Sequence, residues 1–331
     1  MTGNEYYDNR YKTRIENCYS KLNNKKQLKT LKGFEKYMAI DGTLISTRMN
    51  YVGRIVTFLN KVDKELKDIE FADYVDYLSL YQDKTSSYQI QIYTALKRFS
   101  EYLSYSKITK ADYMENVKRP KDRESIETKQ KREKSFLTEK ELEKFLLRVT
   151  CGMNVKESPT QKTVQARDHA LIMILLGTGL RCSAVSKLDI SDVDLESGKI
   201  QVTEKRGKVR TCYLSEDIIT ILKTWLDERN NFVTEESDNA LFLSSEGNRL
   251  NDKRINKIIE KYGEGIKKGV HLSPHKLRAT YGTMIYKKTG DIYLTKNCMG
   301  HSDISTTMLY VRGQEEQAQK KAAEVMAGVL F

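Results

Sequence analysis

Four side chains in the C-terminal part of the sequence have types and spacings that suit a phosphate-binding pocket. His275 and Arg278 are three residues apart, so they share one face of a helix that Pro274 can open at its first position. His301 follows a glycine, and Tyr310 comes nine residues later, after a Ser-Asp helix-start signal and a short helical run. Two imidazoles, a guanidinium and a phenol are poor core residues, whereas together they can surround a phosphate.

Two further stretches supply cations ahead of these residues. Residues 168–176 form a nearly continuous apolar run, which predicts a helix that the following Gly-Thr-Gly stops, and Arg181 comes soon afterwards. Residues 199–204 and 209–214 alternate like two short strands around a Lys-Arg-Gly-Lys turn, which predicts a hairpin with lysines at its tip. Each cation alone is more often an ordinary surface residue. Their order and spacing relative to the histidines and Tyr310 indicate a shared site.

Taken in order, these motifs resemble those of the tyrosine recombinases, also called phage integrases. The matching segments are TGLR at 178–181, the hairpin VTEKRGKVR at 202–210, HKLR at 275–278, GH at 300–301 and Tyr310. The resemblance covers most of residues 136–312. It implies an integrase-type site-specific DNA recombinase, an enzyme that cleaves and rejoins DNA through a 3′-phosphotyrosine intermediate and a Holliday junction.

The resemblance implies catalytic roles for Arg181, Lys205, His275, Arg278, His301 and Tyr310. Tyr310 would be the nucleophile, although a phenol with a reference pKa of about 10 attacks poorly until its proton is removed. The two arginines would hold the non-bridging oxygens of the scissile phosphate with their planar forks. His301 would hydrogen-bond a non-bridging oxygen, His275 would help to accept the tyrosine proton, and Lys205 would protonate the leaving 5′ oxygen.

Neither a metal ion nor another cofactor is expected. Arginine and lysine would supply the positive charge that other phosphoryl-transfer sites take from magnesium, and no acidic cluster in the sequence suits a metal ion. Because the phosphotyrosine bond stores the energy for rejoining, ATP is not needed either. Five scattered cysteines without CxxC spacing suggest neither a zinc site nor a disulfide framework.

Two positions depart from the family pattern. Ala184 stands where the family usually has a Glu or Asp that braces the site, three residues after the first arginine, and Ala279 stands where His is often found. The hairpin also leaves open whether Lys205 or Lys208 is the acid. Two alternatives to a recombinase remain: a type IB topoisomerase, which shares the phosphotyrosine chemistry, and a DNA-binding protein whose catalysis has weakened.

The expected fold is mainly α-helical, with a small β-hairpin or sheet in the C-terminal domain. Apolar residues at helical spacing between about residues 33 and 116, such as Val52, Ile55, Val56 and Leu59, predict a small all-helical domain. The resemblance implies that this core-binding domain and the catalytic domain form a C-shaped clamp on DNA. The expected divisions are an N-terminal extension at 1–33, the helical domain at 34–117, a basic linker at 118–134, the catalytic domain at 135–313 and a terminal helix at 314–331.

The charge of the chain favours a nucleic-acid partner but does not establish one. Lysine and arginine total 57 against 45 acidic residues, a formal net charge of +12. The segment 118–134 holds eight basic residues and four acids, so it is either a solvated tether or a strap across a DNA backbone. The expected DNA contacts in the linker and the hairpin are Lys118, Arg119, Lys121, Arg123, Lys131, Arg132, Lys208 and Arg210.

The expected partners are duplex DNA recombination sites and further copies of the chain. In the family, the helix that corresponds to residues 314–331 commonly packs into a neighbouring protomer, which implies a homotetramer on paired sites. An accessory directionality factor could be a further partner. No apolar run approaches the ~18 residues of a membrane span. The N-terminus shows no signal peptide, and a cytoplasmic, nucleoid-associated protein is expected.

Overall fold

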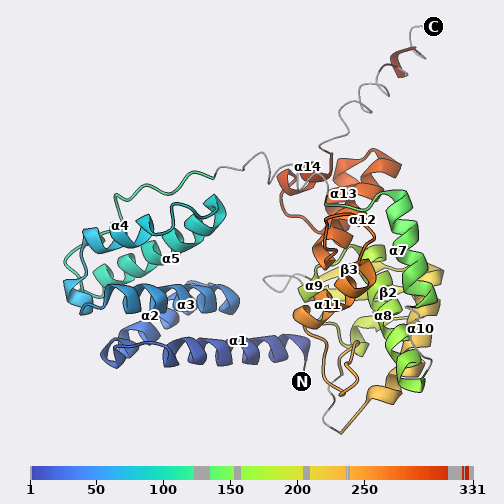
Figure 1. Cartoon of the computed structure of the whole chain (residues 1–331), viewed down its shortest axis with the longest axis horizontal. Coiled ribbons are helices and arrows are strands. Elements are labelled where there is room, and N and C mark those ends of the chain that lie inside the picture. Colours follow the sequence, from blue (N-terminus) through green and yellow to red (C-terminus); the bar gives the residue numbers. More distant parts are fainter. Residues whose placement is uncertain are drawn as a thin grey trace. The chain divides into compact units, whose positions relative to one another are not determined.

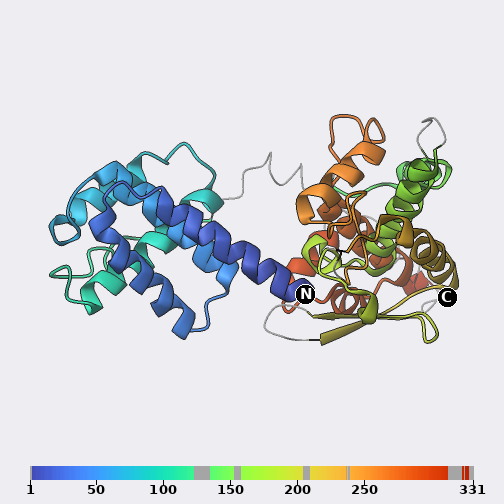
Figure 2. The same cartoon turned by 90° about the horizontal axis from the view of Figure 1, so that it is seen from below.

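The chain forms two compact units, one over residues 4–125 and the other over residues 126–331 together with residues 1–3. The computed structural model describes residues 2–122, 135–152, 158–203, 209–235, 237, 239–311, 323 and 325–327. Within these residues the chain is mainly helical and contains one three-stranded antiparallel sheet (Figure 1 and Figure 2), which confirms the predicted fold class. No helix in the described ranges is long and apolar enough to cross a bilayer.

The N-terminal unit is built from helices over its described residues. They are α1 (Gly3–Ser20), α2 (Leu28–Ile40), α3 (Ile45–Val62), α4 (Phe71–Ser79) and α5 (Ser86–Tyr105), with 3-10 turns at Lys25–Gln27 and Leu66–Asp68. Phe99 of α5 packs edge-on against Phe34 of α2, with ring centroids 5.2 Å apart. On α3 the predicted apolar face is buried, as expected, at Val52, Ile55, Val56 and Leu59.

The N-terminal extension predicted over residues 1–33 contributes to the core of this unit. Helix α1 occupies much of the segment, and Ile15, Tyr19, Leu22 and Leu31 are buried in the same cluster as Phe99. The segment looks weakly structured in sequence because its few apolar side chains stand among charged residues and tyrosines. Ile15 and Tyr19 are nevertheless four residues apart and share one helical face. The boundary suggested near residue 33 therefore falls inside a packed unit.

The described part of the C-terminal unit combines helices with a small sheet. Its helices are α7 (Glu139–Cys151), α8 (Pro159–Thr178), α9 (Cys182–Val185), α10 (Glu216–Arg229), α11 (Asp252–Gly263), α12 (Pro274–Thr289), α13 (Ile292–Met299) and α14 (Ser305–Val311), and short 3-10 turns span Ile190–Asp192 and Asn230–Phe232. The strands β1 (Val193–Asp194), β2 (Lys199–Thr203) and β3 (Val209–Tyr213) pair in the order β1-β2-β3. Strands β2 and β3 confirm the predicted hairpin, whose tip at 204–208 lies outside the described residues.

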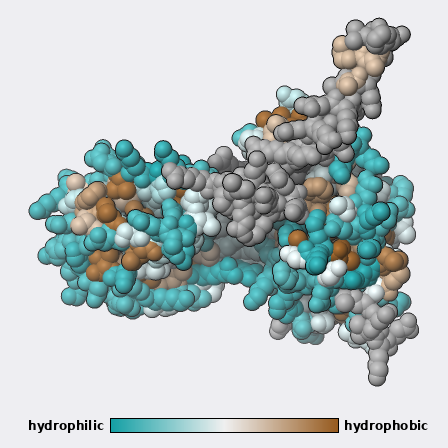
Figure 3. All heavy atoms as spheres, turned by 45° about the horizontal axis from the view of Figure 1, so that its top comes forward, coloured by the Kyte–Doolittle hydropathy of each residue, from teal (hydrophilic) through white to brown (hydrophobic). Residues whose placement is uncertain are grey.

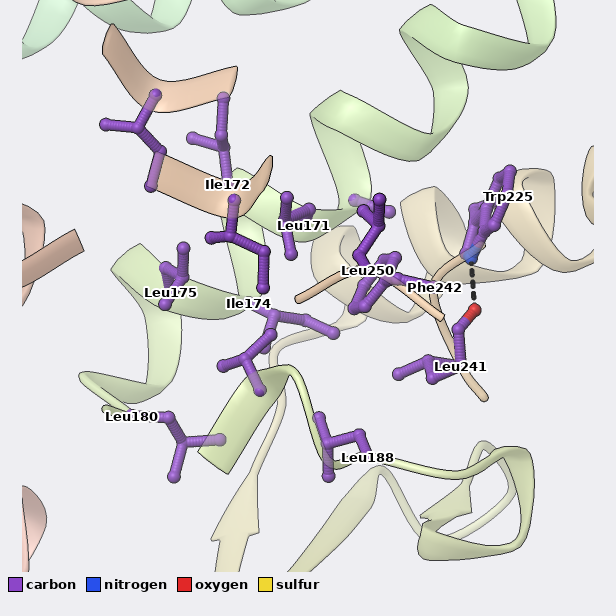
Figure 4. Close-up of a cluster of buried hydrophobic side chains, with 14 of the residues drawn as sticks. Leu171, Ile172, Ile174, Leu175, Leu180, Leu188, Trp225, Leu241, Phe242 and Leu250 are labelled. Atoms are coloured by element: carbon purple, nitrogen blue, oxygen red, sulfur yellow. Dashed lines mark hydrogen bonds between the residues drawn. The ribbon is translucent and has the colours of Figure 1, made fainter. Parts of the chain in front are cut away.

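Helix α8 runs through the core of the C-terminal unit and packs against both α10 and α12. It starts after Ser158, whose side chain accepts a hydrogen bond from the backbone N–H of Gln161. Figure 4 shows the surrounding apolar cluster, in which Trp225 of α10 donates its Nε1–H to the carbonyl of Leu241 at 2.9 Å. The apolar residues of α8 in this cluster are Ala170, Leu171, Ile172, Ile174 and Leu175. Because α8 is enclosed by the core, it is a firm support for the glycine turn that ends it.

Hydrophilic side chains cover most of the face of the molecule shown in Figure 3, and apolar residues are scattered among them. This agrees with a sequence in which 31% of the residues are charged. Isolated apolar residues on a protein surface need no special explanation.

Candidate active site

Arg278 is buried between two turns of the chain. It lies on α12 and is only 5% exposed. Its Nη1 donates a hydrogen bond to the carbonyl of Gly179, and its Nη2 donates one to the carbonyl of Met299 at 2.5 Å. Gly179 stands two residues before Arg181, and Met299 stands two residues before His301. One guanidinium therefore holds two of the predicted site segments beside α12.

The turn at Gly179 explains the second glycine that ends α8. Gly179 has φ +60°, and a Cβ at this position would lie 2.3 Å from Cδ1 of Tyr281. The backbone then enters α9, where the carbonyl of Arg181 accepts hydrogen bonds from the N–H groups of Ala184 and Val185 at 2.9 and 3.1 Å. The backbone at Arg181 is thereby fixed by the glycine turn before it and by helix α9 after it, while the side chain of Arg181 is exposed.

The two departures from the family pattern are apolar positions in the structure. Ala184 is partly buried against the core of the C-terminal unit, and Ala279 is buried on α12. A residue other than Ala184 anchors helix α9: Ser186 Oγ at its C-terminal end donates a hydrogen bond to Asp252 Oδ1 at 2.7 Å. Asp252 is the first residue of α11, so α9 is braced from that helix.

His301 lies in a buried turn just after α13. Gly300 ends the helix with φ +62°, and the backbone N–H of His301 donates to the carbonyl of Lys296 at 3.1 Å. The imidazole Nδ1 lies 2.9 Å from Oγ1 of Thr307 on α14. His301 is thus held to the end of α13 by its backbone and to the helix on which Tyr310 lies by its ring.

Several positive charges act on this imidazole. Burial, the largest cause, lowers the pKa of His301 to about 4, and the other causes are the charges of Arg278, Arg181, Arg210 and His275. His301 is therefore neutral at pH 7 and can donate a hydrogen bond without adding a charge. The residues whose charges act on His301 come from the turn before α9, from β3 and from α12.

Arg210 is one of these charges, although it was predicted as a DNA contact. It lies on β3 opposite Val202 of β2, and Nη1 donates to the carbonyl of Cys298 at 2.8 Å. Residues directly opposite each other in an antiparallel pair share a face of the sheet, and Val202 is buried. The strand alternation therefore held a signal that Arg210 faces inward, toward the end of α13.

The structure describes some of the other predicted site residues and leaves others outside its described ranges. His275 is exposed on the first turn of α12, one turn before Arg278. The backbone of Tyr310 lies on α14, which packs against α12 and α13. The predicted DNA contacts exposed at the end of the N-terminal unit are Lys118, Arg119 and Lys121. The predicted site residues outside the described part of the chain are Lys205, Arg123, Lys131, Arg132 and Lys208.

Thr307 was not predicted as a site residue. It is three residues before Tyr310 on α14, and this helical spacing is the sequence signal that could have found it. Among the described residues, no group of three or more His, Cys, Asp or Glu side chains is placed to hold a metal ion. All five cysteines fall within the described ranges and are free thiols.

The model of the phage integrase family matches residues 135–317, more than half of the chain. The chain belongs to the phage integrase family. The matched region includes the turn before Arg181, helix α12, the turn before His301, and Tyr310. The cluster of charges around His301 thus coincides with the part of the chain that defines its family.

Curated relatives match a shorter region. Tyrosine recombinase XerC of Escherichia coli O127:H6 is 38% identical over 146 residues, which are 44% of this chain and 48% of that protein. XerC of Escherichia coli O1:K1 is 37% identical over a region of the same size. The chain thus matches about half the length of these curated relatives.

Solved structures of several recombinases share the fold over most of the chain. XerH site-specific recombinase bound to a palindromic difH substrate superposes with a TM-score of 0.64 at 22% identity, covering 95% of this chain and 94% of XerH. A lambda integrase dimer bound to a COC′ core site gives a TM-score of 0.61 at 17% identity, covering 86% of this chain and 95% of that one. These similarities establish the fold.

Replacing Arg181 with glutamine should raise the pKa of His301, because one of the charges that disfavour the imidazolium is removed. The pKa can be followed by NMR titration of the free protein, and a His301→Gln variant assigns the signal among the four histidines. The matched control is Arg254→Gln, which removes an exposed arginine that pairs with Glu246. This control should leave the pKa of His301 unchanged. Equal shifts in both variants, or none with Arg181→Gln, would contradict the charge cluster.

Proposed function

We propose that this protein is a site-specific DNA recombinase of the integrase type, which breaks and rejoins DNA through a covalent bond between Tyr310 and a 3′ phosphate. The observation that carries the proposal is the set of cations around a neutral His301. The imidazole of His301 is in turn hydrogen-bonded to the helix on which Tyr310 lies. A phosphodiester is the ligand such a site suits, because its non-bridging oxygens carry negative charge that fixed cations stabilise during transfer.

Arg278 and Arg181 would hold the two non-bridging oxygens. A guanidinium has five N–H donors, so Arg278 can serve two backbone carbonyls and a phosphate together. Arg181 would approach from the exposed side of the site. The neutral His301 would donate a hydrogen bond to a phosphate oxygen, where an imidazolium would be disfavoured by the surrounding charges.

In the cleavage step, the phenolate oxygen of Tyr310 would bond to phosphorus while the bond from phosphorus to the 5′ oxygen breaks. His275, exposed one turn before Arg278, would help to accept the phenolic proton. A hairpin lysine, Lys205 or Lys208, would protonate the departing 5′ oxygen. A 5′ hydroxyl from a partner strand would then attack the phosphotyrosine and reverse the chemistry, so no ATP is consumed.

Duplex recombination sites are the proposed substrate. In their solved structures, XerH is bound to a difH substrate and lambda integrase to a core site, which supports the same class of ligand for this fold. The exposed Lys118, Arg119 and Lys121 would contact the DNA backbone. We further propose a homotetramer on two synapsed sites, exchange of the segment 314–331 between protomers, and action on DNA of the nucleoid in the cytoplasm. An accessory protein would set the direction of recombination.

A covalent-trap assay tests the proposed chemistry. Nicked duplexes that carry candidate sites from the DNA flanking the gene would be incubated with protein in EDTA, and covalent adducts would be counted after denaturation. Wild type should form an adduct that Tyr310→Phe abolishes, because the nucleophilic oxygen is gone. The matched control is Tyr293→Phe, which changes an exposed tyrosine of α13 and should keep the adduct. Specific DNA binding by wild type without any adduct would contradict a recombinase and favour a binding protein with weakened catalysis.

The choice between Lys205 and Lys208 can be made with DNA in which sulfur replaces the bridging 5′ oxygen. A thiolate leaves without being protonated, so the variant that lacks the acid should regain a near wild-type rate on this DNA. On ordinary DNA, Lys205→Ala should cleave about 100-fold more slowly or worse, and Lys208→Ala is its control. A defect of Lys205→Ala that persists with sulfur would show that Lys205 is not the acid.

A further inference from the structure

Thr307 makes a buried contact with His301 that no proposed step has yet used. Its Oγ1 lies 2.9 Å from Nδ1 of the imidazole. Thr307 is completely buried, and His301 is 9% exposed, so water hardly competes for this hydrogen bond. By contrast, the preceding residue, Thr306, is exposed on the same helix.

The direction of this hydrogen bond decides what His301 can do. A neutral imidazole has one N–H and one bare nitrogen, and the two tautomers differ in which nitrogen carries the proton. Because Nδ1 is engaged by Thr307, a hydrogen bond from the ring to a phosphate oxygen has to come from Nε2. A phosphate oxygen can only accept a hydrogen bond, so Nε2 must carry the proton. Nδ1 is then the bare nitrogen and must accept a hydrogen bond. A hydroxyl can donate it, and Thr307 has the hydroxyl in place.

We propose that Thr307 is a positioning residue, whose hydroxyl donates to Nδ1 and holds His301 as the tautomer with the proton on Nε2. Were the bond reversed, Nδ1–H would donate to Thr307, and the lone pair of Nε2 would face the phosphate. That arrangement would repel the substrate instead of holding it.

The same contact also bears on the helix that carries Tyr310. Thr307 lies on helix α14 three positions before Tyr310, which is less than one helical turn. A hydrogen bond that attaches Thr307 to the ring therefore also limits rotation of the helix that carries Tyr310. His301 and the backbone of Tyr310 are in this way set relative to each other by one buried hydroxyl.

This inference rests on the proposed recombinase function, and three variants test it. Thr307→Val keeps the shape and removes the hydroxyl, Thr307→Ser keeps the hydroxyl, and Thr306→Val is the exposed control. The tautomer is measured on the free protein from the imidazole ¹⁵N shifts, with His301→Gln for assignment. Activity is measured as the single-turnover rate of adduct formation at saturating protein, alongside DNA affinity.

We expect wild-type His301 to carry its proton on Nε2 and Thr307→Val to contain both tautomers. Thr307→Val should form the adduct about 10- to 100-fold more slowly with unchanged DNA affinity, since loss of a residue that orients a catalytic group typically costs that much or more. Thr307→Ser and Thr306→Val should stay within a few fold of wild type.

A wild-type His301 protonated on Nδ1 would overturn the inference, whether or not the variants fold. So would a Thr307→Val protein with wild-type rate, or Thr307→Ser and Thr307→Val proteins with equal losses. If wild type forms no adduct on sites that it binds specifically, the proposed function fails, while the tautomer measurement still decides the role of Thr307.

Discussion

The buried guanidinium of Arg278 is the interaction on which the rest of the site depends. A charge that is taken out of water is costly unless hydrogen bonds compensate it, and an arginine cannot escape the cost by losing its proton. The carbonyls of Gly179 and Met299 provide that compensation. Both belong to turns that end helices, and each turn is followed by another site residue. Burying Arg278 therefore requires the turns before Arg181 and His301 to be in place, which couples assembly of the site to folding.

The site that results gathers positive charges before any ligand is bound. Burial is the main reason why the imidazole of His301 is neutral, and the charges of Arg278, Arg181 and Arg210 add to this effect. Such a cluster is unfavourable by itself, because like charges repel. The proposed phosphodiester substrate would relieve the repulsion, most of all when charge builds on its non-bridging oxygens during transfer. Folding itself thus brings the cations together before the substrate binds, and this is the electrostatic environment that the proposed reaction needs.

The sequence predicts local features of this molecule better than contacts between distant segments. Helix α12, the β2–β3 hairpin and the glycine turns follow from periodicity, proline and glycine, all of which act over a few residues. The inward position of Arg210 depends on a contact with residue 298, which is 88 positions away. The packing of α1 likewise depends on tertiary burial of a segment whose composition is mostly polar. Motif order alone predicts the proposed catalytic residues, whereas the contacts of Arg210 and Thr307 could be found only from the fold.

A double-mutant cycle between Arg181 and His301 tests most directly whether the cations and the imidazole serve one phosphate. Single-turnover rates of adduct formation would be compared for wild type, Arg181→Gln, His301→Gln and the double variant. Because the two side chains interact and would act on the same group, the double variant should lose less than the product of the single losses, by about fivefold or more. Losses that simply multiply would contradict a site in which these residues act as a unit.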